Sequence, residues 1–254
     1  MENEKEIQQF KNRLRDLADK SYQQDIFTYS NFLNMAEIDI YCQLERELSY
    51  AHPTLYGGHE AFERAILRFG DVDASGYDPG FPVQCIYIKP ATPKFAEALT
   101  HRDFLGALMN LGIERQTLGD IIVNEKEAWV FVLDKISEYI CDNLTKVRHN
   151  NVKCIPVENA DLLPKSVTED VTIQVASLRL DAVIAKVHHL SRETSLELFR
   201  ASKVYVNGRL TENNSMSLRG GESISVRGFG KFVVGEDSHT TKKGRLAVTV
   251  TVYR

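Results

Sequence analysis

The side chains best suited to binding chemistry in this sequence are arginines and lysines spread along its last third. Arginine and lysine donate charge-assisted hydrogen bonds to phosphate and carboxylate oxygens. We expect six of them at helix ends and in turns, which are positions from which a side chain can reach a ligand. They are Arg179, Arg192, Lys203, Arg209, Arg227 and Lys231. The pattern predicts contact with a polyanion. On charge alone, a solvated basic surface explains it equally well.

The charge of the chain is unevenly distributed. Residues 177–254 carry 13 basic and 7 acidic side chains, a balance of +6, whereas residues 1–176 carry 18 and 28, a balance of −10. A local positive field attracts nucleic acid, and an acidic remainder limits indiscriminate binding. The last third is therefore the predicted binding region, within a protein whose total charge is −4.

Ser191 and Arg192 suggest how a phosphate could be held there. Serine is a favoured N-cap, and the unpaired N–H groups of the first helical turn attract anions. Arg192 would add a cation at the same place. Such an arrangement suits the backbone of structured RNA better than base edges, which are poorly accessible in an A-form helix.

The elements that must position these residues follow from hydrophobic spacing in residues 172–254. Apolar side chains at helical spacing predict a helix over 180–190, and a second helix follows Ser191. Residues 204–206 lead into Asn207-Gly208, the pair that most readily forms a tight hairpin turn. Alternating apolar residues near 224–226 and 246–252 predict further strands.

The middle of the chain, residues 75–160, has the predicted order β-α-β-β-α-β. This order indicates a ferredoxin-like sheet with both helices on one face. Trp129 and Phe131 alternate on one predicted strand and Tyr87 lies on another. The three aromatic rings could form a second RNA surface that stacks bases, or they could fill a core or a contact between domains.

Residues 1–74 are predicted to form a mostly helical domain. Asn34 and Glu37 have the spacing of a capping box at the start of a helix. Apolar residues between Phe62 and Phe69 also show helical spacing. Residues 71–82 and 158–170 are predicted linkers. The whole chain is therefore predicted to be α+β, with three domains.

Four motifs in the last third resemble an S4 domain, an RNA-binding module. They are Arg179-Leu180-Asp181, Leu190-Ser191-Arg192 and residues 202–208 and 220–224. Residues 226–232, the run from His101 to Gly106, Gly119-Asp120-Ile121 and Gly57-Gly58 are similar to the YlmH family of bacterial RNA-binding proteins. His59 and Phe62 depart from that family's pattern, where Tyr and Ala are expected. The similarity spans almost the whole chain.

The resemblance implies a protein that binds rRNA and tRNA on the large ribosomal subunit carrying peptidyl-tRNA and assists the rescue of stalled nascent chains. Because no membrane span or signal segment is evident, we expect a cytoplasmic protein without a membrane partner, and we expect a monomer away from the ribosome. The RNA-binding candidates are Arg179, Ser191, Arg192, Lys203, Asn207, Arg209, Arg227 and Lys231, with a possible second surface at Tyr87, Trp129 and Phe131.

No catalytic residue, metal or cofactor is expected. The four cysteines lack zinc-ligand spacing, and no signal segment or membrane span is evident. His101-Arg102-Asp103 looks like a kinase catalytic loop, but the other kinase motifs are missing. The main alternative is an RNA-modifying enzyme, such as a pseudouridine synthase, with an appended S4 domain. Asp181, however, fits a salt-bridge partner or helix-surface residue better. A third possibility is a protein-interaction scaffold.

Overall fold

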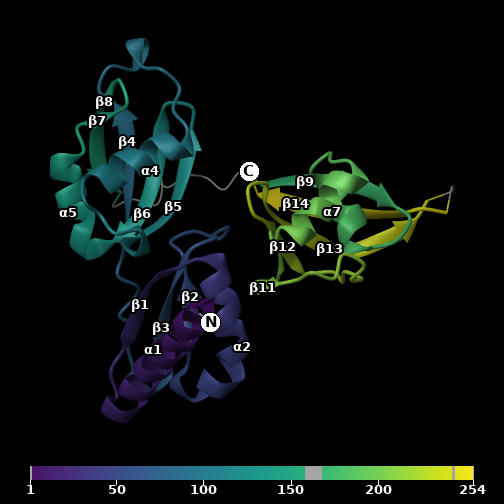
Figure 1. The fold of residues 1–254 in the computed structure, drawn as a ribbon, viewed down its shortest axis with the longest axis horizontal. Coiled ribbons are helices and arrows are strands. Elements are labelled where there is room, and N and C mark those ends of the chain that lie inside the picture. Colours follow the sequence, from purple (N-terminus) through teal and green to yellow (C-terminus); the bar gives the residue numbers. More distant parts are fainter. Residues whose placement is uncertain (1, 158–167, 242–243, 254) are drawn as a thin grey trace. The chain divides into compact units, whose positions relative to one another are not determined.

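The computed structural model describes residues 2–157, 168–241 and 244–253, which fold as mixed helix and sheet of the predicted α+β class (Figure 1). The chain divides into two compact units, Met1–Lys165 and Ser166–Arg254. Of the predicted linker over 158–170, residues 158–167 lie outside the described residues and the last three begin a strand.

The first unit begins with helices packed around a small antiparallel sheet of order β1-β3-β2. The predicted capping box is confirmed at α2: Asn34 Oδ1 accepts from Glu37 N at 3.2 Å, and Glu37 Oε2 accepts from Asn34 N at 2.8 Å. The elements are α1 (Glu2–Gln24), β1 (Thr28–Leu33), α2 (Met35–Leu48), a 3-10 turn (Ser49–Ala51), β2 (Thr54–Tyr56), β3 (Ala65–Phe69) and α3 (Val72–Ser75).

The helix predicted between Phe62 and Phe69 is wrong. Ala65–Phe69 is the central strand of the small sheet, and all five of its residues are buried. Four of these five residues are apolar, and so short an apolar stretch also satisfies helical spacing. The amino-terminal part thus combines its helices with a three-stranded sheet.

The second part of this unit is an antiparallel sheet of order β5-β6-β4-β8-β7. Helices α4 and α5 pack on one face, where Phe104 and Ile140 meet Ile86 and Val130 (Figure 1). The elements are β4 (Val83–Pro90), a 3-10 turn (Pro93–Phe95), α4 (His101–Asn110), a 3-10 turn (Arg115–Thr117), β5 (Leu118–Asn124), β6 (Glu127–Leu133), α5 (Asp134–Asn143), β7 (Lys146–Val147) and β8 (Asn150–Pro156).

The opposite face of this sheet is partly closed by the amino-terminal sheet. Phe32 and Ile66 lie in one buried cluster with Cys85 and Phe131. Gly58 permits this closure: it has φ +94°, and a Cβ there would lie 2.2 Å from the Phe131 ring. The glycine pair therefore has a packing role, because a side chain at Gly58 would push the loop away from Phe131.

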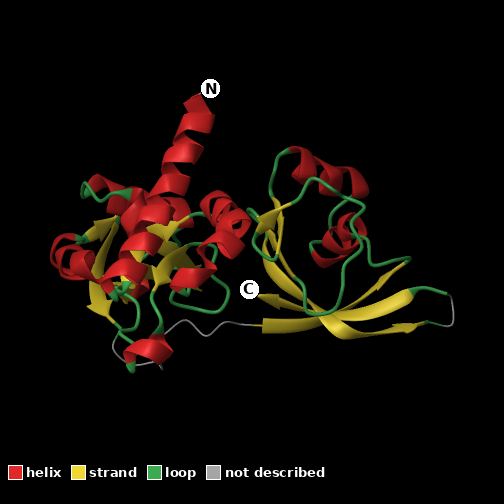
Figure 2. Cartoon of the chain, turned by 90° about the horizontal axis from the view of Figure 1, so that it is seen from below, coloured by secondary structure: helices red, strands yellow, loops and turns green. Residues whose placement is uncertain are grey.

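The second unit is one antiparallel sheet of order β11-β10-β12-β13-β14-β9, with α6 and α7 on the same side (Figure 2). Helices and sheet share one core, which includes Val183, Leu198, Ile224 and Val250. The elements are β9 (Thr168–Val175), α6 (Leu180–Val187), α7 (Arg192–Arg200), β10 (Val204–Val206), β11 (Arg209–Leu210), β12 (Ser223–Val226), β13 (Gly230–Thr240) and β14 (Leu246–Tyr253).

Candidate functional site

The site is built around a carboxylate at the start of α6. Asp181 has a side chain that is only 2% exposed, and Arg179 grips it with two hydrogen bonds: Nε to Oδ1 at 3.1 Å and Nη2 to Oδ2 at 2.9 Å. The backbone N–H of Ala182 also donates to Oδ1, at 2.9 Å. The bond from Arg179 is the main reason that the pKa of Asp181 lies below its ordinary value. Asp181 is therefore a salt-bridge partner, and it is not a helix-surface residue.

The ion pair of Arg179 and Asp181, called the clasp below, is held in place by the surrounding backbone. Leu180 N and Asp181 N donate to the carbonyls of Met216 and Asn214, at 2.9 and 3.0 Å. Ser195, which is fully buried on α7, donates from Oγ to Asp181 O at 2.9 Å. The fork of Arg179 is consequently held in one orientation while its side chain stays 38% exposed. A cation positioned in advance loses less conformational entropy when it binds a ligand.

A groove of about 710 Å³ runs beside this clasp, between α6, the start of α7 and the ends of β9 and β14. Small and apolar residues such as Ala182 and Ala185 form part of its lining. Five side chains of its lining are basic or can become so: Arg179, Lys186, His189, Arg192 and Arg245. Asp181 is the acidic residue of the lining, and it is already paired with Arg179. The groove therefore offers positive charge to a ligand.

Three of the groove residues were not identified from the sequence. Lys186 on α6 and His189 just after it follow Arg179 and Ala182 at near-helical spacing, so a polar stripe could have revealed them. Arg245 joins through the pairing of β14 with β9, where Leu246 faces Val175. Strand β9 was not predicted, because its first residues fall in the predicted linker. Its signal is the alternation of Val171, Ile173 and Val175, which is typical of a half-buried strand.

Ser191 and Arg192 occupy the predicted positions at the start of α7. Ser191 is the N-cap, and its Oγ accepts from Thr194 N at 3.0 Å. Arg192 is exposed and lines the groove together with Arg179. The predicted cap is confirmed. The Ser191 hydroxyl already accepts a hydrogen bond from one N–H group of the first turn. The side chain of Arg192 is therefore the main group that this helix start offers to a ligand in the groove.

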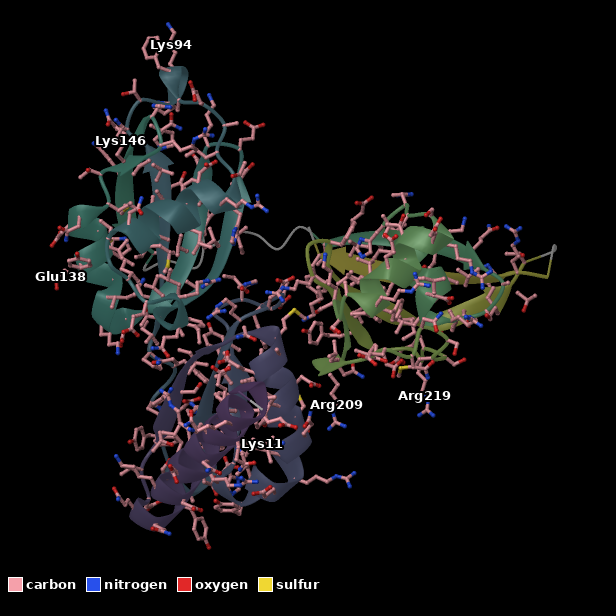
Figure 3. The ribbon with its side chains drawn as sticks, in the orientation of Figure 1. Lys11, Lys94, Glu138, Lys146, Arg209 and Arg219 are labelled. Atoms are coloured by element: carbon pink, nitrogen blue, oxygen red, sulfur yellow. The ribbon has the colours of Figure 1, made fainter. Side chains whose placement is uncertain are left out.

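The remaining predicted basic residues lie elsewhere on the unit. Lys203 follows the far end of α7, and its carbonyl accepts from Arg227 N at 2.9 Å, so these two exposed residues are neighbours. Lys231 Nζ lies 5.4 Å from the centre of the Tyr253 ring. Arg209, on the edge strand β11, projects away from the ribbon (Figure 3). These residues do not line the groove.

Asn207 forms the predicted hairpin turn. Asn207 and Gly208 have φ of 51° and 78°, and Asn207 Oδ1 accepts from Ser223 N at 2.9 Å. Positive φ at both positions is the requirement of a type I′ turn, which these two residue types meet at little cost. Its side-chain oxygen therefore ties the turn to β12, while Asn207 itself stays exposed.

Of the three aromatic residues proposed as a second surface, Phe131 is a core residue. It is 1% exposed, and the His59 ring stacks on it with centroids 4.9 Å apart. Its inclusion in a base-stacking surface is thus wrong, because the amino-terminal layer covers it. Tyr87 and Trp129 form a directly opposed cross-strand pair on the same sheet, and both remain partly exposed.

A second cluster of charged groups, in the first unit, faces inward. Asp120 Oδ2 binds His59 Nε2 at 3.0 Å and accepts from Glu63 N at 2.8 Å. Arg64 donates to the carbonyls of Leu118, Phe32 and Arg115, at 2.8, 3.1 and 3.2 Å. Burial lowers the pKa of Arg64 to about 10. These contacts join the two sheets of the unit, and the cluster is structural.

The motif His101-Arg102-Asp103 is a helix start. Thr100 caps α4, and Asp103 Oδ2 accepts from Thr100 N at 2.8 Å. Within the described residues, no group of three or more His, Cys, Asp or Glu side chains could hold a metal ion. The described helices are also each too short or too polar to cross a membrane.

The family comparison matches the middle sheet of the first unit and does not extend to the groove of the second unit. Residues 78–161 match the family described as "Putative RNA-binding domain in YlmH". The chain is 32% identical over 196 residues to "Ribosome-associated protein quality control protein P2" of Bacillus subtilis, covering 76% of this chain and 75% of the relative. It is also similar in fold to "Cell division protein ylmH from Streptococcus pneumoniae", with a TM-score of 0.50, 20% identity, and coverage of 63% of this chain and 95% of the other.

Proposed function

Because this chain belongs to the YlmH family, we propose that it is an RNA-binding protein of ribosome-associated quality control. In this proposal it binds rRNA and tRNA on a large ribosomal subunit that carries peptidyl-tRNA, and it helps to release stalled nascent chains. It would act as a monomer in the cytoplasm. The family match and the relative's name support the RNA-binding role, and the groove of the second unit supports the site.

The observation that carries the proposal is the Arg179–Asp181 clasp at the edge of a basic groove. Arg179 is the N-cap residue of α6 and Arg192 is the first residue of α7, and both line the same groove. Exposed arginines held at fixed positions recognise phosphate oxygens well, because the guanidinium group donates two parallel hydrogen bonds. We assign the second unit to the S4 class on this basis, with Lys203 and Arg227 as a second basic group and Arg209 and Lys231 extending the surface.

We further propose that the middle sheet is ferredoxin-like, since its four long strands have the order β5-β6-β4-β8 expected of a β-α-β-β-α-β chain. The proposed role does not require catalysis. If the chain were a pseudouridine synthase, Asp181 would be its candidate catalytic carboxylate. Asp181, however, accepts three hydrogen bonds and is almost fully buried. A carboxylate so engaged is poorly placed to attack a base.

The test is co-sedimentation of the full chain with large ribosomal subunits. The double variant Arg179→Ala, Arg192→Ala should lose most of the sedimenting protein at about 0.15 M salt, because two charged phosphate contacts are removed. The variant Arg13→Ala, Arg46→Ala removes two charges from the first unit and should sediment as the unmodified protein does. Equal sedimentation of both double variants would contradict the proposed site.

Sedimentation after nuclease treatment of a lysate separates RNA binding from the scaffold alternative. If RNA holds the protein to its partners, the partners are lost when RNA is digested. A partner that remains bound after digestion, with the same yield as before, would show that protein contacts dominate and would overturn the RNA-binding proposal.

A further inference from the structure

The second face of the middle sheet is divided into a covered half and an open half. The covered half contains Cys85, Phe131 and Leu133, which are buried against Phe32 and Ile66 of the amino-terminal sheet. Side chains of a strand alternate between faces, so Tyr87 and Lys89 continue the face of Cys85, and Trp129 continues that of Phe131. These continuing residues are partly exposed.

Two aromatic rings form the centre of the open half. Tyr87 and Trp129 are directly opposite each other on β4 and β6, with ring centroids 5.0 Å apart and ring planes inclined by only 23°. Ile155 of β8 pairs with Tyr87, and Ile122 of β5 pairs with Trp129, so an aliphatic side chain flanks each ring. Together these four side chains form one apolar row across the sheet.

Positive charge borders this row. Lys89 Nζ lies 5.8 Å from the centre of the Tyr87 ring, and Lys153, which is exposed, is directly opposite Lys89 on β8. Glu127 is the acidic neighbour, and it is engaged with the Tyr87 hydroxyl. Burial and this bond raise the pKa of Tyr87 to about 12, so the ring stays neutral at physiological pH. The surface thus combines apolar rings with two lysines.

We propose that this surface, formed by Tyr87, Trp129, Lys89 and Lys153, binds an unpaired RNA strand by stacking a base on the aromatic pair and placing phosphates near the lysines. Every base has a flat π face, and stacking on aromatic side chains is tolerant of sequence. A paired helix hides these faces, so the surface selects single strands. The proposal assumes the RNA-binding role given above, but it does not depend on the groove of the second unit.

The chain contains one tryptophan, and it lies in the proposed surface. Its fluorescence therefore reports stacking directly. Titration of the full chain with a ten-nucleotide oligouridylate should quench Trp129 emission to saturation. A fully paired RNA hairpin of similar length should quench much less. Tyr87→Leu should raise the dissociation constant about tenfold, as expected for loss of one stacking ring.

Two further variants separate stacking from loss of fold. Tyr87→Phe keeps the ring and removes the bond to Glu127, so it should quench as the unmodified chain does. Lys89→Glu, on a partly exposed side chain, should weaken binding several-fold at low salt. Lys135→Glu is the matched control, because Lys135 is exposed on α5, which packs on the other face of the same sheet. It should have no effect on quenching.

The Arg179→Ala, Arg192→Ala variant distinguishes this surface from the groove. It should lose affinity for the paired hairpin and keep quenching by oligouridylate. If the unmodified chain bound no hairpin yet was quenched by oligouridylate, the groove would be wrong and this proposal would stand. If saturating oligouridylate left Trp129 emission unchanged, or if Tyr87→Leu and Lys89→Glu quenched like the unmodified chain, the proposal would be wrong.

Discussion

The two units use arginine in opposite ways. In the first unit, Arg64 and Arg115 turn inward and donate to backbone carbonyls of the loop before β5 and its first residues, and burial lowers the pKa of both. In the second unit, Arg179 grips Asp181 but keeps its outer side open, and Arg192 is exposed. Arg64 joins two sheets and Arg115 fixes the loop before β5, whereas Arg179 and Arg192 line a groove.

This difference shows that the location of its hydrogen-bond partners decides whether an arginine is structural or available to a ligand. Arg64 gives three of its five donors to backbone carbonyls of its own unit, and its side chain is partly buried, so its role is structural. A guanidinium group has five hydrogen-bond donors. Arg179 uses two of them to bind the carboxylate of Asp181, so others remain for a phosphate. The same residue type is therefore structural in one unit and available for binding in the other.

The largest expected effect is on stability, at Arg64. Arg64→Ala removes three hydrogen bonds to part-buried carbonyls, and the loss of each bond costs roughly 1 kcal/mol. We expect the free energy of unfolding of the full chain to fall by about 3 kcal/mol in urea. The exposed Arg46→Ala should change it by less than about 0.5 kcal/mol. A loss at Arg64 no larger than at Arg46 would contradict the inward role.

A somewhat smaller effect is expected in the core of the second unit. Leu198 is 5% exposed, whereas Leu196 is partly exposed. Leu198→Ala should lower the free energy of unfolding by about 2–3 kcal/mol, and Leu196→Ala by less. Thermal unfolding of each variant measures this. The reverse order would show that α7 packs by another face.

A third effect concerns the clasp and depends on pH. The pKa of Asp181 is lowered in the folded protein, so the carboxylate contributes stability above its unfolded pKa of about 3.9 and loses it as pH falls through the folded value. Asp181→Asn should cost about 1–2 kcal/mol at pH 7. The unmodified chain should lose more stability than this variant as pH is lowered below about 4. Parallel losses in both proteins would contradict the clasp.

Much of the fold was accessible from the sequence, because its elements have strong local signals. The capping box at Asn34, the hairpin at Asn207-Gly208 and the strand at 246–252 each depend on a few adjacent residues. Strands β1, β2 and β3 were missed because they are short and their pairing is decided by partners distant in sequence. Local spacing cannot distinguish a buried strand of five residues from a helical turn.

The candidate site was accessible only in part. Arg179 and Arg192 were identified, and the structure places both in one groove. Arg245 was missed, since it reaches the groove through the pairing of β14 with β9. Phe131 was misassigned because alternation along a strand shows that a ring faces one side, but not that another layer covers that side.

The most direct test of the central claim is the salt dependence of affinity for a paired RNA hairpin. If Arg192 binds a phosphate through the groove, Arg192→Ala should weaken binding by about three- to tenfold at low salt and reduce the slope of log affinity against log salt by about one unit. Arg46→Ala, which removes an equal charge from an exposed position in the first unit, should leave the slope unchanged. An unchanged slope in Arg192→Ala, measured by fluorescence anisotropy over the same salt range, would contradict the account.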